Sequence, residues 1–571
     1  MATHHTPLHQ AAAEAVAAHA GIPAADLKVE APPRPELGDL AVGCFAIAKA
    51  SKQSPAEVAG AIAAAFTPTP LLASATASGP FVNFHADRSA TYRWLIDAAL
   101  RSRLVPSELG AGKTICIDYG SPNISKHLAY HHIRGTTIGH ALAQTFRALG
   151  YRVVGINFLG DWGTTHGMLL AAWARWGPVE PVDVTALNAL YVRFRAAMKE
   201  DPALEQDGRV WFKRLEDGDP EARALWQRFR DVSWAEFQSV YEILGIEYDE
   251  VRGESAYEPD MPRIFETLAA GGLSTESQGA LVVELAGEKN PILLRTRDGT
   301  TLYATRDVAA AEYRWTNYQF TRSLYVVDRG QALHFRQLFK VLDKMGHAWA
   351  ARCEHVPYGL VKIGNQRAAT RLGNVILMRD VFTIAEAMIR EKIAAINPDL
   401  APAIVDDVAR KVGIGAIVFA NLAPQRDKDI DFDIENAVSI EGDSGPYLQY
   451  SHARCAQLAR KAGDRVTAIE GIDVGLLVQP AEWAVARRLI ELPDAVVRAA
   501  EACEPHVIAH YLLQLAADFS RWYTLGNGDA SLRVVCEDLA TRRARLALTA
   551  AVQATLRDGL AMLGIAAPDQ M

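Results

Sequence analysis

The chain has 571 residues, of which 50% are apolar and 22% charged, and its formal net charge is −8. This length predicts roughly three to five domains, each with enough apolar residues to bury a core. The net charge excludes attraction of nucleic acid by the molecule as a whole, so any RNA contact must come from local basic patches. The sequence has no apolar run of about 18 residues and no apolar core at its N-terminus, so we expect a cytoplasmic protein without a membrane segment.

The cysteines are widely scattered along the chain, at Cys44, Cys116, Cys353, Cys455, Cys503 and Cys536. No two of them form a close zinc-binding pair, and they do not form a dense disulfide framework. We expect them to be reduced and structural, and we expect no bound metal.

The first part of the chain alternates short extended pieces with Ala-rich helical pattern. Residues 40–52 and 56–66 place apolar residues at helix spacing, and residues 79–84 have the pattern of a closing strand. We expect a small α+β domain over residues 1–111.

The next part has the pattern of a βαβ unit. A strand over residues 113–119 leads through a turn at 120–123 into a helix at about 132–149, and a second strand follows at 152–158. This order implies a parallel sheet with its ligand at the carboxyl ends of the strands. A charged helical stretch at about 171–245 interrupts the sheet, which we expect to resume at 281–285, 323–328 and 355–362. Beyond residue 445 nearly all of the sequence has helical periodicity.

The turn after the first strand of that unit has the character of a phosphate site. It leaves a strand and opens a helix, where free backbone N–H groups and the positive end of the helix dipole favour an anion. Four histidines occur within fourteen residues there: His127, His131, His132 and His140. Such histidines taken alone are more often solvated than catalytic or metal-binding.

This segment resembles the part of arginyl-tRNA synthetases that carries the class I His-x-Gly-His signature. The positions that match are Ser121, Pro122, Asn123, Ile124, Lys126, His132, Arg134, Thr136, Ile138 and Gly139. Further matches follow in the family's order, at residues 160–164, 253–255, 302–307, 331–335, 441–454 and 568–571. Each match alone could be core packing or a turn, but together they cover essentially the whole chain.

The resemblance implies a multidomain α/β protein. Its parts would be a small α+β domain that binds the tRNA elbow (1–111), a Rossmann-type parallel-sheet catalytic domain (112–440) with a helical insertion at about 171–245, and an all-α anticodon-binding domain (441–571). It also implies arginine, ATP with Mg²⁺ and tRNA-Arg as partners. We expect a monomer.

The residues of the amino-acid side fit the chemistry of arginine. A planar guanidinium with five donors is best met by ionised carboxylates in a fork geometry. Carried over by position, Glu254 and Asp307 are similar to those carboxylates, although either one alone could be a surface or capping acid. The α-amino and carboxylate end would be held by Ser121, Asn123, Tyr303 and Gln331, with Asp118 as a supporting carboxylate.

The ATP side departs from the family pattern. Ala129 stands in place of the first signature histidine, His131 in place of its glycine, His127 in place of a proline and His140 in place of an aspartate, while Thr165-His166 replaces Gln-Phe. The later phosphate loop, residues 368–373, lacks its lysine, and Lys126 occupies the place that many such relatives use instead. The resemblance implies ATP binding by His131, His132, Gly160, Asp161, Thr370 and Arg371, with His132, Lys126 and Arg371 stabilising phosphate charge.

Two interpretations follow. In the first, the chain is an ATP-dependent ligase that forms arginyl-adenylate and passes the arginyl group to tRNA-Arg. In the second, it is a paralogue that binds arginine but has lost or redirected that chemistry. The retained acids fit both interpretations, the RNA-binding ends favour the first, and the altered signature favours the second.

Overall fold

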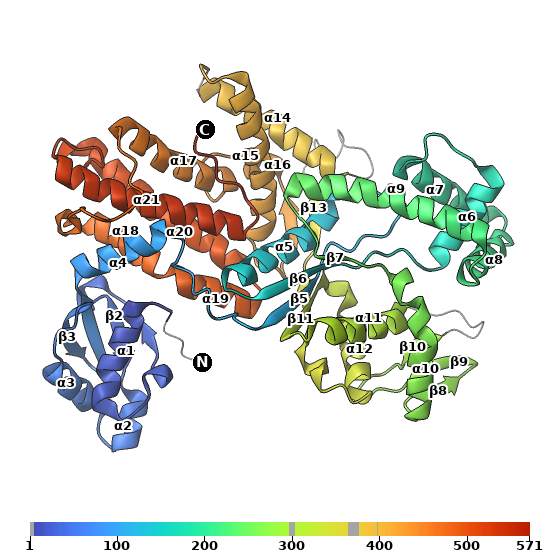
Figure 1. Cartoon of the computed structure of the whole chain (residues 1–571), viewed down its shortest axis with the longest axis horizontal. Helices are drawn as coiled ribbons and strands as arrows, with labels where there is room; N and C mark the ends of the chain where they lie inside the picture. The colour runs from blue at the N-terminus through green and yellow to red at the C-terminus, as the bar shows by residue number, and fades with distance from the viewer. Residues whose placement is uncertain (1–4, 296–302, 364–375, 397) are drawn as a thin grey trace.

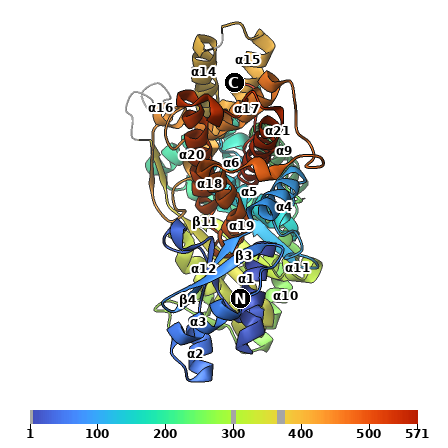
Figure 2. The same ribbon diagram turned by 90° about the vertical axis from the view of Figure 1, so that its left-hand side faces the viewer.

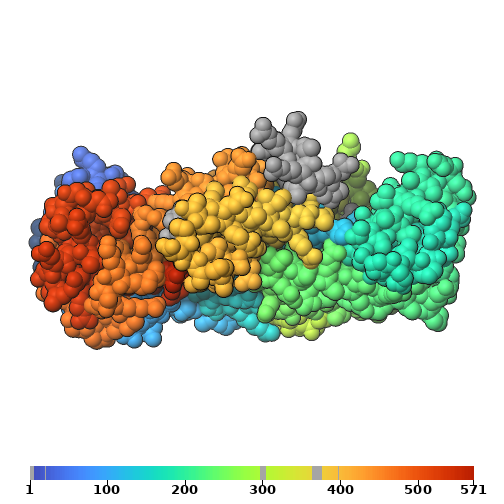
Figure 3. All heavy atoms as spheres, turned by 90° about the horizontal axis from the view of Figure 1, so that it is seen from above, coloured from blue at the N-terminus to red at the C-terminus, as the bar shows by residue number. Residues whose placement is uncertain are grey.

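The molecule is elongated, and a central parallel sheet lies in its middle (Figure 1). A computed structural model describes residues 5–295, 303–363, 376–396 and 398–571. The N-terminal sheet and the C-terminal helices lie at one end of the long axis, and the helical insertion lies at the other end (Figures 1 and 3).

The N-terminal part is an antiparallel sheet with helices, as predicted. Its strand order is β1 (Val29–Glu30), β2 (Leu40–Gly43), β4 (Phe81–Ala86) and β3 (Leu72–Ser78), with α1 (Pro7–Ala20), α2 (Phe45–Ser51) and α3 (Pro55–Ala65). The helix predicted over residues 40–52 is wrong in its first part, because Leu40–Gly43 form a strand between β1 and β4. Short apolar runs fit a buried strand as well as a helix, and here strand pairing decides.

The central sheet has five parallel strands, which confirms the predicted βαβ architecture. In spatial order they are β12 (Cys353–Tyr358), β11 (Arg322–Asp328), β5 (Thr114–Asp118), β6 (Arg152–Asn157) and β7 (Glu250–Val251). The chain runs outward from β5 through β6 to β7, then returns to the other side of β5 for β11 and β12. The strand order therefore reverses between β5 and β11, where ligands of such sheets bind.

Two of the predicted strands lie elsewhere. The strand predicted at 281–285 is β9 (Ala280–Val283), which pairs with β8 (Thr275–Ser277) and β10 (Ile292–Arg295) in a separate antiparallel sheet. The stretch 355–362 divides between β12 and β13 (Val361–Ile363), and β13 pairs with β14 (Ile430–Phe432). Periodicity identifies a strand but not its partner.

The two faces of the central sheet are covered by different helices. Ile115 and Ile117 on β5 pack into a core with α5 (Ile133–Ala148), while Cys116 between them packs into the core on the opposite face. That second core includes α10 (Met261–Ala270), α11 (Tyr303–Tyr318) and α12 (Ala332–Lys344). Side chains of a strand alternate between faces, so a buried strand serves both cores.

The insertion between β6 and β7 is helical, as predicted. It consists of α6 (Thr164–Trp176), α7 (Val184–Glu200), α8 (Leu204–Glu216) and α9 (Pro220–Leu244), followed after β7 by the 3-10 segment η4 (Glu254–Asp260). Asp183 and Asp219 cap α7 and α9, each accepting a hydrogen bond from a backbone N–H in the first turn.

The C-terminal part is helical, which confirms the prediction for residues beyond 445. Its helices beyond residue 445 are α17 (Gly445–Ala462), α18 (Pro480–Ile490), α19 (Leu492–Ala502), α20 (His506–Gly528) and α21 (Leu539–Met562). The helices α14 (Met378–Ile396), α15 (Pro402–Leu422) and α16 (Ile434–Ala437) precede them in the chain. The C-terminal helices stand above the N-terminal sheet, and α4 (Arg88–Leu100) packs between the two parts (Figure 2). Among the described residues, no helix is long and apolar enough to span a membrane.

The C-terminal helices also hold α5, the helix that follows the signature segment. Helices α15, α19 and α21 pack against it. Its buried His140 lies directly under Gly564, which follows α21 with a φ of 73°. A Cβ at Gly564 would lie 2.6 Å from Cδ2 of His140. His140, which the sequence comparison assigned to the ATP side, therefore belongs to the contact between domains.

We expect Gly564→Ala to destabilise the protein more than Gly463→Ala. Both glycines have a left-handed backbone, with φ values of 73° and 65°, but a Cβ at Gly463 would meet nothing within 4 Å. Gly463→Ala should cost about 1 to 2 kcal/mol for the backbone alone, and Gly564→Ala about 1 to 3 kcal/mol more for the collision. Scanning calorimetry of the two variants measures the difference. Equal costs would show that His140 moves aside freely.

Candidate active site

The turn after β5 is fixed by a buried ion pair. Asp118, the last residue of β5, accepts hydrogen bonds from Ser121 Oγ at 2.8 Å and from Arg314 of α11 at 2.6 Å. Both of its oxygens are thus occupied by protein donors, and Arg314 is almost fully buried. Asp118 therefore connects the end of β5 to α11 on the other side of the reversal in strand order.

Ser121 and Asn123 lie exposed on this turn, where the sequence places the amino-acid end of the ligand. The backbone of the turn is tied to the loop after β6, since Ile124 N donates to Gly160 O and Gly160 N donates to Pro122 O. A Cβ at Gly160 would lie 2.2 Å from Asn123 Oδ1 and 3.3 Å from Asn123 Cα, so any larger residue there would displace the Asn123 side chain. The structure thus brings Gly160 against the turn, where it permits close packing of two loops.

Glu254 of η4 and Asp307 of α11 lie close enough for their charges to interact, in a group of part-buried acids that we call the acidic pocket. Glu254 Oε2 accepts a 2.9 Å hydrogen bond from Arg306 Nε, and Asp307 Oδ2 lies 2.7 Å from Nε2 of His334 on α12. The other oxygens, Oε1 of Glu254 and Oδ1 of Asp307, have no hydrogen-bond partner within residues 5–295, 303–363, 376–396 and 398–571. In each carboxylate, therefore, one oxygen is held by a protein side chain and the other could accept a hydrogen bond from a ligand.

Burial sets the electrostatics of this pocket. It raises the pKa of Glu254 to about 7, Arg306 opposes the rise, and the charges of Asp307 and Asp161 add to it. Burial also raises the pKa of Glu216 on α8 to about 6, with Glu258 as a second cause. Acids with raised pKa values gather where a cationic ligand would restore their charge.

Asp161 is enclosed within the protein and has no exposed surface. Its carboxylate accepts hydrogen bonds from Ser255 N and Oγ, both at 2.8 Å, and from Arg230 Nε at 3.2 Å. A Cβ at Gly253 would collide with the same carboxylate. Asp161 thus bonds to Ser255 and packs closely against Gly253, the two neighbours of Glu254.

The signature histidines form a pair at the start of α5. The rings of His131 and His132 are 4.1 Å apart, and His132 Nδ1 lies 3.0 Å from the carbonyl oxygen of Ala129. Burial lowers the pKa of His132 to about 4, with the neighbouring His131 adding to the effect, so His132 is neutral at pH 7. Because a carbonyl oxygen only accepts, the ring proton is on Nδ1, and Nε2 carries the lone pair.

Two other histidines of the altered pattern have structural partners. His127 Nδ1 lies 2.6 Å from Glu236 Oε1 of α9, and its Nε2 lies 3.2 Å from Thr185 Oγ1 of α7. It therefore joins the signature loop to the insertion. His166 near the start of α6 is buried, and burial lowers its pKa to about 4.

The remaining predicted residues are only partly described. Lys126 is exposed, with its Nζ 5.7 Å from the centre of the Tyr191 ring on α7. Gln331 is exposed and ends the 3-10 segment η5 (Arg329–Gln331) that follows β11. Tyr303 begins α11. Thr370 and Arg371 lie outside the described residues.

The site also contains residues that the sequence did not single out: Arg306, His334, Glu258 and Ser255. Arg306 and His334 occur inside motifs that were recognised, next to the predicted acids or three residues after Gln331. The signal that could have identified them is charge balance, because two buried acids require cations nearby.

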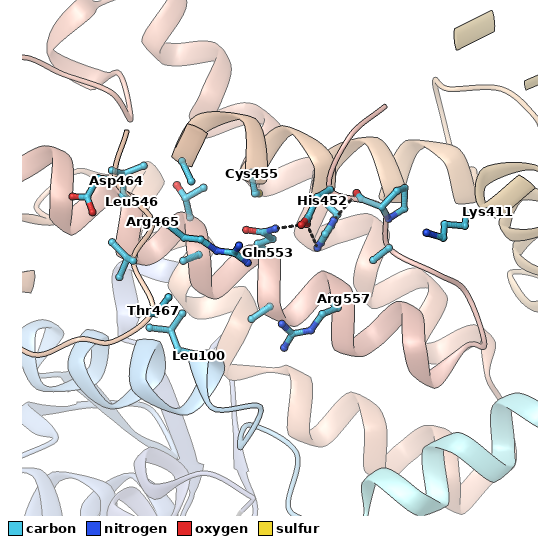
Figure 4. Close-up of a pocket in the computed structure, with 18 residues that line it drawn as sticks. Leu100, Lys411, His452, Cys455, Asp464, Arg465, Thr467, Leu546, Gln553 and Arg557 are labelled. Carbon is cyan, nitrogen blue, oxygen red and sulfur yellow. Dashed lines mark hydrogen bonds and ion pairs between the residues drawn. The ribbon is translucent and has the colours of Figure 1, made fainter. Parts of the chain in front are cut away.

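A separate pocket of about 480 Å³ lies among the C-terminal helices (Figure 4). It is lined by α17, α21 and the C-terminal tail, where His452 and Gln553 are hydrogen-bonded to Pro568 and Asp569. It shares no residue with the arginine and ATP sites predicted from the sequence.

Comparison with known proteins agrees with this architecture. Residues 96–434 match the family described as "tRNA synthetases class I (R), catalytic domain", residues 448–571 match "DALR anticodon binding domain", and residues 6–86 match "Arginyl tRNA synthetase N terminal domain". The fold and its catalytic domain are therefore those of a class I aminoacyl-tRNA synthetase.

Proteins that are similar over nearly the whole chain identify the family within this class. The chain is 41% identical to an arginine–tRNA ligase of Exiguobacterium sp., with 95% of each chain covered, and 39% identical to one of Clostridium perfringens, with 95% and 96% covered. The solved arginyl-tRNA synthetase of Thermus thermophilus superposes with a TM-score of 0.82 at 26% identity, covering 99% of this chain and 100% of that one. The chain belongs to the arginyl-tRNA synthetase family.

We expect Asp161→Asn to destabilise the protein by about 2 to 3 kcal/mol, because it weakens hydrogen bonds from three part-buried donors to a buried charged acceptor. Asp231→Asn on α9 is the matched control, since Asp231 is exposed and should change stability by less than about 0.5 kcal/mol. Thermal unfolding followed by circular dichroism compares the two. Equal unfolding temperatures would contradict this role of the Asp161 hydrogen bonds.

Proposed function

We propose that this protein ligates L-arginine to tRNA-Arg with ATP, through an arginyl-adenylate. The observation that carries the proposal is the acidic pocket, in which Glu254 and Asp307 each have one oxygen held by a protein cation or histidine and the other available. A guanidinium presents parallel N–H donors, so two fixed carboxylate oxygens on different elements fit it better than they fit a lysine ammonium.

The rest of the substrate would extend from this pocket to the turn after β5. We assign the amino and carboxylate end of arginine to Ser121 and Asn123 in this turn, Tyr303 at the start of α11 and Gln331 before α12. Asp118 supports the turn and does not contact the ligand directly. The other oxygen of the bound arginine carboxylate is then free to attack.

In the first step an arginine carboxylate oxygen attacks the α-phosphorus of ATP, and the bond to the bridging oxygen breaks to release pyrophosphate. In the second step the terminal 2′-hydroxyl of the tRNA attacks the carbonyl carbon, its proton leaves, and AMP departs. We assign stabilisation of the phosphate charge to Lys126, His132 and Arg371, with His131 and Thr370 beside the nucleotide.

The neutral state of His132 bears on the first step. With its proton on Nδ1, the ring meets a phosphate oxygen with the lone pair of Nε2 and must gain a proton before it can donate there. The negative charge of ATP favours that proton. Mg²⁺ would accompany the ATP phosphates. Among the described residues no three His, Cys, Asp or Glu side chains gather as metal ligands, and no step above depends on a protein-bound metal.

The outer domains would recognise the tRNA. We assign the elbow to residues 1–111 and the anticodon to residues 441–571, with the catalytic domain at 112–440 between them, and we place a monomer in the cytoplasm. The interpretation as an arginine-binding paralogue without ligase activity has no support from the relatives, which are named as arginine–tRNA ligases.

The direct test is arginine-dependent exchange of pyrophosphate into ATP, measured with and without tRNA-Arg. We expect exchange that requires arginine and is strongest with tRNA present. Arginine binding without exchange or tRNA charging would instead support the paralogue.

We expect Glu254→Gln and Asp307→Asn each to weaken arginine binding by about 10- to 100-fold, since each removes an ionised acceptor worth about 1.5 to 3 kcal/mol. Calorimetry at pH 8 measures the affinity. Glu312→Gln is the control, because Glu312 lies on α11 but pairs with Arg263 and His347 outside the pocket. Unchanged affinity in both pocket variants would mean that arginine binds elsewhere.

We expect the double change Ala129→His with His131→Gly to raise arginine-dependent ATP turnover about tenfold or more, a fraction of what one oriented donor contributes. The change restores a donor and removes a side chain from the helix start. The single change His131→Gly separates the two effects. A fall in turnover would show that the adjacent His131 and His132 are working parts of a rebuilt nucleotide site.

A further inference from the structure

Arg306 is buried in the acidic pocket, between two carboxylates. It lies in the first turn of α11, directly before Asp307, and is only 4% exposed. Its Nε donates to Glu254 Oε2 at 2.9 Å and its NH1 donates to Glu258 Oε1 at 3.3 Å. One guanidinium thus bridges two acids of η4.

We propose that Arg306 is a positioning residue, a built-in guanidinium that aligns Glu254 for the guanidinium of the substrate. Arg306 holds Oε2 of Glu254 and is itself held by Glu258, so the carboxylate cannot rotate without breaking a buried ion pair. This leaves Oε1 of Glu254 fixed in place for the ligand. The inference rests on the proposed function, because it takes Glu254 to be an arginine ligand.

The backbone around Glu254 reinforces this alignment. Glu254 N donates to Leu159 O, and Asp161 accepts hydrogen bonds from Ser255 on one side of Glu254 and packs against Gly253 on the other. Backbone and side chain are therefore fixed by different partners. Preorganisation of this kind lowers the entropy lost when a ligand binds.

The positive charge of Arg306 also opposes the rise in the pKa of Glu254. Among the described residues, both acids and bases lie near Glu254. The acids are Asp307 on α11, Asp161 after β6, Glu258 on η4 and Glu216 on α8. The bases are Arg306 on α11, Arg223 and Arg230 on α9, His166 on α6 and His334 on α12. The pKa of Glu254 is raised to about 7 and would rise further without Arg306, leaving Asp307 and Asp161 as its nearest charges. Arginine binding should therefore strengthen as the pH rises through 7, when Glu254 becomes ionised.

The experiment compares Arg306→Gln and Arg306→Lys with the wild type. We expect Arg306→Gln to raise the KM for arginine about tenfold or more while leaving the KM for ATP near its original value. The pH midpoint of arginine binding should move upward by about one pH unit, because an opposite charge has been removed. Arg306→Lys keeps the charge without the two-carboxylate bridge, so its KM for arginine should rise while its pH midpoint stays near that of the wild type.

Arg263→Gln is the matched control. Arg263 also pairs with a carboxylate on α11, Glu312, but is half exposed outside the pocket, and its loss should move neither quantity. If the wild type bound no arginine, the proposed function would fail. If the wild type bound arginine and both Arg306 variants kept its KM and pH midpoint, only the positioning role would fail. Should Arg306→Gln not fold, the KM of Arg306→Lys decides: an unchanged KM overturns the inference.

Discussion

The buried ion pair between Asp118 and Arg314 fixes the geometry on which the site depends. It joins the end of β5 to α11, two elements far apart in the sequence that meet where the strand order reverses. Arg314 also lies over the rings of Phe158 and Tyr325. Because α11 carries both Arg306 and Asp307, the distance from the turn to the acidic pocket is set by this pair. Loss of either partner would leave an uncompensated buried charge.

The acidic pocket next to this ion pair consists of acids that are each held by a neighbouring base. Asp161 and Arg230 form an inner support, Arg306 and His334 hold Glu254 and Asp307, and the outer oxygens of those acids remain for a ligand. Burying several carboxylates without neighbouring cations would cost free energy of folding. Here Arg306 and His334 hold the acids in place, yet the pKa of Glu254 is still raised to about 7. A bound guanidinium would therefore stabilise the ionised form of Glu254 further.

Much of this could be predicted from the sequence. Alternating and helical periodicity predicted the βαβ unit, the insertion and the C-terminal helices, and motif order pointed to Glu254 and Asp307. Periodicity failed for Leu40–Gly43 and for β9, where the choice of strand partner decides the structure. It also could not find that Arg306 holds Glu254, because that contact joins residues 52 positions apart. The resemblance grouped His140 with the ATP side, whereas its place on α5 buries it against Gly564.

The altered signature has a physical explanation in part. His127 bonds to α7 and α9, His140 packs against the residues after α21, and His166 is buried at the start of α6, so three of the replacements serve packing between elements. Within the described segment 126–140, the replacements that remain to change the nucleotide site are Ala129 and His131. The carbonyl of Ala129 orients the His132 ring, and the His131 ring lies against it at a tilt and helps to lower its pKa. These two replacements therefore both act on the His132 imidazole, the residue to which we assign stabilisation of the phosphate charge.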